Sequence, residues 1–167
     1  MMAMDRDAQP CPKVLLVCAG NTCRSPMAAT LLAARLGGDC PVSSAGTAAR
    51  AGDPAAASAV QVMAERGLDL SAHRAQPISQ ELVAQSDLVL TMTRSQRQMV
   101  IDLVPGAADR VFTLVEYATC PTCPPSAEGL DIPDPLGMGI DVYRTTADHL
   151  QQLVDRVADK LMGCDRT

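Results

Sequence analysis

The chain has 167 residues, of which 47% are apolar and 2% are aromatic, and its formal net charge is −5. This length is enough for one domain with a proper core, and that core must consist of aliphatic and methionine side chains rather than rings. The negative charge argues against nonspecific binding to nucleic acid, and no run of about 18 apolar residues indicates a membrane span.

The start of the chain is polar and lacks the apolar segment of a secretory signal. We therefore expect residues 1–10 to form a flexible tail and residues 11–167 to form a single domain. The seven cysteines are an odd number, which together with the missing signal predicts reduced thiols in a cytoplasmic protein.

In chain order, the hydrophobic pattern predicts alternating strands and helices. The expected elements are a strand at 13–17, a helix at 25–36, a strand at 42–44, helices at 53–66 and 79–84, a strand at 87–92, a helix at 95–104, a strand at 111–114, a loop at 120–139 and a long helix at 141–162. Ser79 is the expected N-cap of the short helix, and Pro105 follows the helix that begins at residue 95. Such alternation predicts a parallel sheet with helices on both faces.

The segment 14–26, VLLVCAGNTCRSP, is the most informative part of the chain. It predicts a strand that ends at Cys18, a short loop, and a helix that begins near Ser25 with Pro26 in its first turn. Backbone N–H groups in such a loop, together with the positive end of the helix dipole, bind a tetrahedral oxyanion and stabilise a thiolate placed beneath it. A cysteine in this position with Arg24 beside it favours phosphoryl transfer through a phosphocysteine.

The same residues resemble the phosphate loop of the low-molecular-weight protein phosphatases, and the resemblance spans about residues 12 to 162. The segments 44–47 (SAGT), 87–92 (DLVLTM) and 134–135 (DP) occur in the order of that family. The resemblance implies a single α/β domain with a four-stranded parallel sheet covered on both faces, of the doubly wound flavodoxin-like kind. It also implies a cysteine-dependent phosphatase that needs no metal or other cofactor.

By this resemblance, Cys18 is the nucleophile and Arg24 binds the phosphoryl oxygens with a bidentate fork. Ser25 steadies the thiolate, and Asn21 holds the loop by a bond to the region of residues 43–44. Asp134 is the general acid that protonates the leaving group. The remaining members of the phosphate-binding loop are Ala19, Gly20, Thr22 and Cys23.

Asp131 is the competing candidate for the acid, and we favour Asp134 because the family has an Asp-Pro pair. A loop rich in proline and glycine suits an acid that must reach over a pocket. Asp131 is then expected to be a solvated charge on that loop.

Two positions bear on specificity. Tyrosine-selective relatives commonly carry Ile or Leu where this chain has Thr22, whereas the members that resemble arginine phosphatases carry Thr. Leu136 follows the Asp-Pro pair where tyrosine-specific relatives usually have an aromatic residue, and the relatives that resemble arginine phosphatases tend to have Phe there, so Leu136 departs from both groups. The chain as a whole has few rings to stack on phosphotyrosine. We therefore expect an enzyme that acts on phosphorylated proteins with a preference for phosphoarginine, and a tyrosine phosphatase is the alternative. We expect the enzyme to be a monomer.

Two further alternatives come from other classes of protein. Thiol-dependent arsenate reductases share the fold and loop, but the region near the third strand has no cysteine to relay a disulfide. A noncatalytic phosphate-binding module would not require Cys18, Arg24 and Asp134 together. The Cys120–Cys123 pair has no second pair or histidine cluster beside it, so two loop thiols are favoured over a zinc site.

Cys23 lies in the same short loop as Cys18. We weigh two roles for it equally: packing, or a disulfide with Cys18 that forms on mild oxidation and makes the protein redox-sensitive.

Overall fold

The computed structural model describes residues 11–119 and 129–163. The tail expected at residues 1–10, and Cys120 and Cys123, lie outside the described residues. The elements are β1 (Val14–Cys18), α1 (Arg24–Leu36), β2 (Val42–Gly46), α2 (Ala57–Glu65), α3 (Gln80–Gln85), β3 (Leu88–Thr91), α4 (Arg94–Leu103), η1 (Pro105–Arg110), β4 (Val111–Thr113), α5 (Leu114–Thr119) and α6 (Ile140–Leu161).

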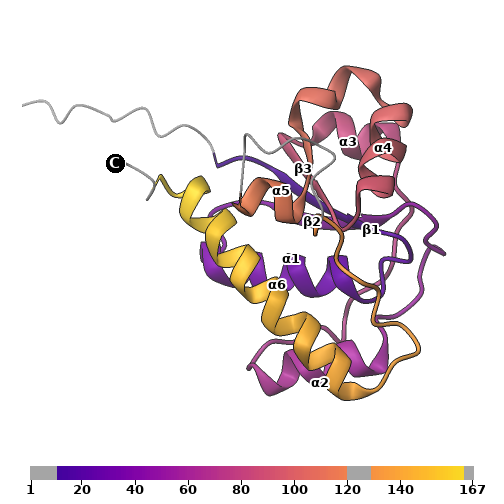
Figure 1. Cartoon of the computed structure of the whole chain (residues 1–167), viewed down its shortest axis with the longest axis vertical. Helices are drawn as coiled ribbons and strands as arrows, with labels where there is room; N and C mark the ends of the chain where they lie inside the picture. Colours follow the sequence, from indigo (N-terminus) through magenta and orange to yellow (C-terminus); the bar gives the residue numbers. More distant parts are fainter. Residues whose placement is uncertain (1–10, 120–128, 164–167) are drawn as a thin grey trace, which may run out of the picture.

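The sheet has four strands in the order β2-β1-β3-β4, and all of its pairings are parallel. The expectation of a four-stranded parallel sheet is therefore confirmed. The chain passes from β1 to β2 on one side, and β3 and β4 lie on the other side, so β1 stands where the strand order reverses. Ligands of such sheets bind at this switch point, outside the carboxyl ends of the strands. Figure 1 shows the long helix α6 alongside α1.

Alternating side chains of β1 divide the core into two parts. Val14, Leu16 and Cys18 belong to the larger core, which α1, α2, α5 and α6 complete. Leu15 and Val17 belong to the smaller core, packed against α3 and α4. The period of two in β1 thus places Cys18 on the side of the sheet that α1 and α6 cover.

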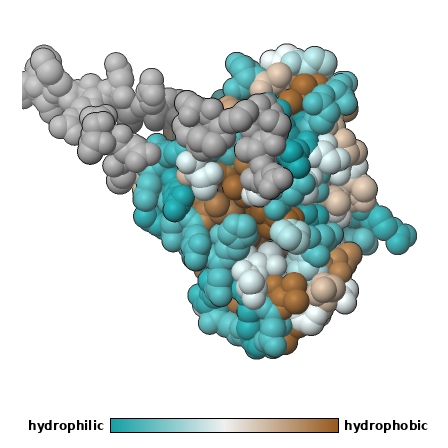
Figure 2. All heavy atoms as spheres, in the orientation of Figure 1, coloured by the Kyte–Doolittle hydropathy of each residue, from teal (hydrophilic) through white to brown (hydrophobic). Residues whose placement is uncertain are grey.

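The long helix α6 is amphipathic, as its sequence pattern predicts. Its buried side chains pack against α1 and α5. Figure 2 shows hydrophobic side chains at the centre of one face, between α5 and α6, while hydrophilic side chains cover the outer side of α6. Among residues 11–119 and 129–163, no helix has the length and apolarity to cross a membrane.

Two predictions of local structure were wrong. The helix expected at 53–66 begins only at Ala57, because Pro54 pairs with Arg74 in an isolated bridge and the Ala56 N–H donates to the Thr22 carbonyl. Tertiary contacts outweigh the helix-start signal there.

Helix α5 was not expected, although Thr113 and Glu116 carry a start signal for it. The Glu116 N–H donates to Thr113 Oγ1 at 3.0 Å, and the Thr113 N–H donates to Glu116 Oε2 at 3.2 Å. This reciprocal pattern is a capping box, so the sequence contained the information.

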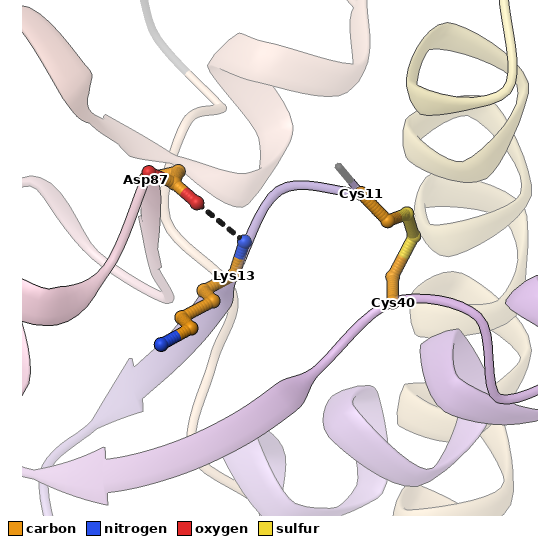
Figure 3. Close-up of a disulfide and its surroundings, with 4 residues drawn as sticks. All are labelled: Cys11, Lys13, Cys40 and Asp87. Atoms are coloured by element: carbon orange, nitrogen blue, oxygen red, sulfur yellow. Dashed lines mark hydrogen bonds between the residues drawn. A yellow bond between two sulfur atoms is a disulfide. The ribbon is translucent and has the colours of Figure 1, made fainter. Parts of the chain in front are cut away.

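The expectation of reduced thiols was also wrong for one pair of cysteines. Cys11 and Cys40 form a disulfide whose Cα atoms are 4.9 Å apart, within the range that the bond requires (Figure 3). Cys11 lies just before β1 and Cys40 just before β2, so the disulfide joins the amino ends of two neighbouring strands. Beside it, the Lys13 N–H donates to Asp87 Oδ2 at 2.8 Å, which ties the same segment to the start of β3.

Candidate active site

The loop of residues 18–25 connects β1 to α1 at the carboxyl edge of the sheet. We call it the 18–25 loop. It curls so that backbone and side-chain donors surround the sulfur at its start. A pocket at this point is lined by residues of the 18–25 loop and by two residues from the loop 129–139: Cys18, Gly20, Thr22, Cys23, Arg24, Asp134 and Leu136. The structure thus brings together nearly all of the site residues that the sequence suggested.

The Cys18 sulfur accepts from two directions. The Asn21 N–H donates to Sγ at 3.2 Å, and Ser25 Oγ lies 2.9 Å from Sγ. Ser25 Oγ also accepts a hydrogen bond from the Asn21 side-chain amide at 2.9 Å, which leaves the serine hydrogen available to the sulfur. Both contacts place hydrogen-bond donors around the sulfur that the mechanism uses as nucleophile.

Asn21 organises the loop from a fully buried position. Its φ of 56° is the only positive φ of a non-glycine residue in the described part of the chain, and asparagine tolerates this left-handed region better than most residues. Its amide also donates to Ser44 Oγ at 2.9 Å, and its Oδ1 accepts from the Gln76 N–H at 3.0 Å. The bond to the region of residues 43–44 that the resemblance implied is present.

Two residues that the sequence analysis did not assign support the same loop. His73 Nε2 donates to the Asn21 carbonyl at 2.7 Å, from a segment 52 residues away in the chain. Gly46, at the end of β2, lets the loop pass close by: a Cβ there would lie 2.4 Å from the Ala19 carbonyl oxygen and 3.0 Å from the Asn21 nitrogen. Nothing in the local sequence around His73 signals this contact.

The Arg24 guanidinium is buried at the base of the pocket. Its Nη1 donates to the Ile132 carbonyl at 2.8 Å, and its Nη2 lies 3.4 Å from Asp134 Oδ2. Its Nε is the one buried side-chain nitrogen or oxygen in the described chain without a hydrogen-bond partner. A buried guanidinium donor without an acceptor is costly, so this N–H suits an oxyanion in the pocket.

The backbone of the loop offers further donors. Within residues 11–119 and 129–163, the N–H groups of Gly20, Thr22 and Cys23 have no acceptor. Cys23 precedes α1 as its N-cap but makes no capping bond with its side chain. The start of α1 and the loop together form a concave set of N–H groups, which is the arrangement that binds phosphate or sulfate.

The two candidate acids have different surroundings. Asp134 lines the pocket, its side chain is 44% exposed, and its Oδ1 accepts the Leu136 N–H at 3.0 Å. Asp131 Oδ1 instead accepts the N–H of Arg94, the first residue of α4, at 2.8 Å. The geometry favours Asp134 as the acid. Asp131 is a solvated charge on the loop, as expected, since its side chain is 49% exposed, and it also joins the loop to α4.

Cys18 and Cys23 are both free and buried. Cys23 Sγ lies 3.7 Å from Thr22 Oγ1 and 3.4 Å from the hydroxyl of Tyr143 on α6. Burial raises the pKa of the Cys23 thiol and of the Tyr143 phenol. A disulfide between Cys18 and Cys23 under oxidising conditions stays a prediction. Tyr143 was not singled out by the sequence, since its partner is 120 residues away.

Comparison with known proteins gives one consistent result. The family model described as "Low molecular weight phosphotyrosine protein phosphatase" matches residues 13–164. A protein-arginine-phosphatase of Geobacillus stearothermophilus is 40% identical over 89% of this chain and 95% of its own length. A probable low molecular weight protein-tyrosine-phosphatase, EpsP, of Ralstonia nicotianae is 40% identical over 85% of this chain and 90% of its own length.

Solved structures agree. The YwlE arginine phosphatase from Geobacillus stearothermophilus superimposes with a TM-score of 0.82 at 39% identity, covering 91% of this chain and 94% of that one. A further YwlE structure, of a cysteine-to-serine mutant with a phosphorylated active-site serine, superimposes with a TM-score of 0.81 at 38% identity, covering 92% of this chain and 97% of that one.

Proposed function

The chain belongs to the low-molecular-weight phosphotyrosine protein phosphatase family, and on that premise we propose that it hydrolyses phosphoarginine in proteins in preference to phosphotyrosine. The observation that carries the catalytic part of this proposal is the convergence of Cys18, Arg24 and Asp134 on one pocket, with the Arg24 Nε free to bind an oxyanion.

In the first step, Cys18 Sγ attacks the phosphorus, and the bond between phosphorus and the leaving nitrogen breaks. The Ser25 hydroxyl and the Asn21 N–H support the thiolate before attack. Asp134 gives its proton to the leaving guanidine, so that the substrate arginine departs with its full complement of protons. The product of this step is a phosphocysteine.

In the second step, water attacks the phosphocysteine, and Asp134 accepts the proton of that water. Inorganic phosphate leaves, and Cys18 returns to its starting state. Throughout both steps, the fork of Arg24 and the N–H groups of Gly20, Thr22 and Cys23 hold the phosphoryl oxygens. In this mechanism, Arg24 and the N–H groups of the loop neutralise the negative charge of the phosphoryl oxygens.

Thr22 and Leu136 support the preference for phosphoarginine. Both line the pocket, so both can meet the group that carries the phosphate. Thr22 offers a hydroxyl and less bulk than Ile or Leu, and Leu136 offers no ring to stack on phosphotyrosine. The guanidine of phosphoarginine instead gains from Asp134, which lines the pocket and can both contact it and protonate it. Relatives named as arginine phosphatases add to this support.

The test compares kcat/KM for peptides that carry phosphoarginine, phosphotyrosine or phosphoserine at the same position. We expect phosphoarginine to be preferred, and we expect Thr22→Ile to lower that kcat/KM and to raise the value for phosphotyrosine. Cys18→Ser should be inactive toward every substrate and serves as the background control. If phosphotyrosine is strongly preferred, or if Thr22→Ile leaves the ratio unchanged, the preference proposed for this chain is wrong.

A tyrosine phosphatase is the second candidate, supported by the description of the family model and by the relatives named for that activity. The peptide comparison separates the two candidates directly. Turnover of arsenate with thioredoxin, or binding of phosphate without turnover of any ester, would indicate the two remaining alternatives. That the enzyme acts as a monomer in the cytoplasm stays a prediction from the sequence.

A further inference from the structure

The two flanks of the 18–25 loop are held in different ways. On the side of β2, several bonds anchor it: Asn21 to Ser44 and Gln76, the Ala48 N–H to the Ala19 carbonyl, and the Ala56 N–H to the Thr22 carbonyl. On the side of α6, one hydrogen bond is found within the described residues, between Cys23 Sγ and the Tyr143 hydroxyl at 3.4 Å. The ring of Tyr143 is 3% exposed, so it is packed as well as bonded.

In this hydrogen bond the side chain of Cys23 points toward α6. An N-cap side chain usually accepts an N–H from the first turn of its helix. The third helical position of α1 is Pro26, which has no N–H, and the Cys23 sulfur makes no capping bond. Because the sulfur is turned to α6 instead, it does not occupy the N–H groups that face the pocket.

We propose that Tyr143 is a positioning residue for the 18–25 loop: by bonding Cys23, it holds the end of that loop against α6 with its N–H groups open to the phosphoryl oxygens. The proposal rests on the proposed function, since it assigns a supporting role to a residue that does not touch the substrate. By this proposal α6 also helps to shape the anion site, through a residue that lies 120 positions after Cys23 in the chain.

The charges of the two groups are compatible with this role. Burial raises the pKa of Cys23 and of Tyr143, so both stay protonated at neutral pH. The carboxylate of Asp134 acts on both groups in the same direction. A neutral pair adds no negative charge beside an incoming phosphoryl dianion, whereas a second thiolate in the loop would repel it.

The first experiment uses Tyr143→Phe, which removes the hydroxyl and keeps the ring. Tyr117→Phe is the matched control, because Tyr117 is the other tyrosine of the chain and lies on α5, where its ring packs against Phe112. We measure kcat/KM for an aryl phosphate and the inhibition constant of inorganic phosphate. Tyr143→Phe should lower kcat/KM and raise the inhibition constant of phosphate, each by about threefold to tenfold, which is the range of one hydrogen bond. Tyr117→Phe should change neither quantity.

The second experiment is a double-mutant cycle with Cys23→Ala. If Tyr143 acts through the sulfur, the Phe substitution should change phosphate inhibition little once Cys23 is absent. A loss of equal size in both backgrounds would mean that the hydroxyl acts through a group other than Cys23 and would overturn the proposal, as would an unchanged inhibition constant in Tyr143→Phe alone. Thermal unfolding of each variant separates a loss of fold from a loss of positioning. A wild-type protein without turnover would instead refute the proposed function.

Discussion

Two loops line the pocket, and they differ in how much of each is buried. The 18–25 loop is mostly buried, and most of its polar side chains have a partner in the protein or line the pocket. The loop 129–139 is anchored by the buried Leu130 and Ile132, but its tip is exposed: Leu136 and Met138 are 60% and 57% exposed, and the Asp134 side chain is 44% exposed. The groups that bind the anion belong to the first loop, and the candidate acid belongs to the second.

The difference reflects two kinds of chemical task. An oxyanion site works best when its donors are fixed before the substrate arrives, because no reorganisation is then needed at the moment of reaction. An acid must instead reach leaving groups that differ from substrate to substrate. Its loop is tied to the rest of the molecule at few points, among them the Ile132 N–H donating to the Met92 carbonyl at 2.8 Å and Asp131 accepting from Arg94.

In the 18–25 loop, the substitution with the largest expected effect on kcat/KM is Arg24→Ala. The guanidinium binds the Ile132 carbonyl and lies near Asp134, its Nε has no partner, and Arg24 lines the pocket. Its removal should lower kcat/KM on any phosphorylated substrate by about 10³-fold or more. Steady-state kinetics check this, with Arg94→Ala as the control, since the Arg94 side chain is 47% exposed and its one ion pair among the described residues is with Asp131 at 3.6 Å. Comparable losses in both variants would contradict the distinction between the loops.

In the exposed loop, the largest expected effect comes from Asp134→Asn. The loss of the general acid should slow turnover of a phosphopeptide by about 10²–10⁴-fold, with a smaller loss for an aryl phosphate whose leaving group needs less help. Asp131→Asn should retain most activity, because its carboxylate bonds the start of α4. Kinetics on both substrates decide the matter; if Asp131→Asn proves the more damaging variant, the two roles must be exchanged.

Two glycines allow a direct comparison of the loops. Gly46 lies against the 18–25 loop, and Gly137 lies within the loop 129–139. In Gly46→Ala the added Cβ would meet backbone atoms of the 18–25 loop at 2.4 Å, and backbone cannot move aside cheaply. We expect up to about a 10²-fold loss of kcat/KM from displaced donors. In Gly137→Ala the φ of 81° is strained, at about 1 kcal/mol of stability, but the Cβ meets nothing within 4 Å. Its activity should fall far less; equal losses would show that the two loops are equally rigid.

The smallest effect is expected from Leu136→Phe. A ring at this exposed position of the pocket rim can stack on a phosphotyrosine, and one aromatic pair contributes about 0.5–1.5 kcal/mol. The variant should therefore raise kcat/KM for phosphotyrosine peptides by about 2- to 10-fold and leave inhibition by inorganic phosphate unchanged. A change in phosphate inhibition would mean that the two loops are more tightly coupled than their contacts suggest.

Much of the fold and the heart of the site follow from local patterns. The apolar runs located all four strands, and the motif from Cys18 to Ser25 identified the 18–25 loop, because each pattern depends on residues close together in the chain. The capping box of Thr113 and Glu116 is also local and was overlooked. The contacts of His73 with Asn21 and of Tyr143 with Cys23 join segments that are far apart in the chain. No spacing or periodicity of residues in the sequence could therefore predict them.

The disulfide between Cys11 and Cys40 has a topological consequence. The two cysteines are 29 residues apart, and the segment between them holds β1, the 18–25 loop and α1. The nucleophile and the guanidinium therefore belong to a closed covalent ring, which the rest of the chain leaves at two points. Closing a ring of this size restricts the unfolded chain and stabilises the fold by about 3–4 kcal/mol in the chain-entropy model. A protease that cut the ring once would leave both pieces attached, whereas a reductant would open it without breaking any bond of Cys18.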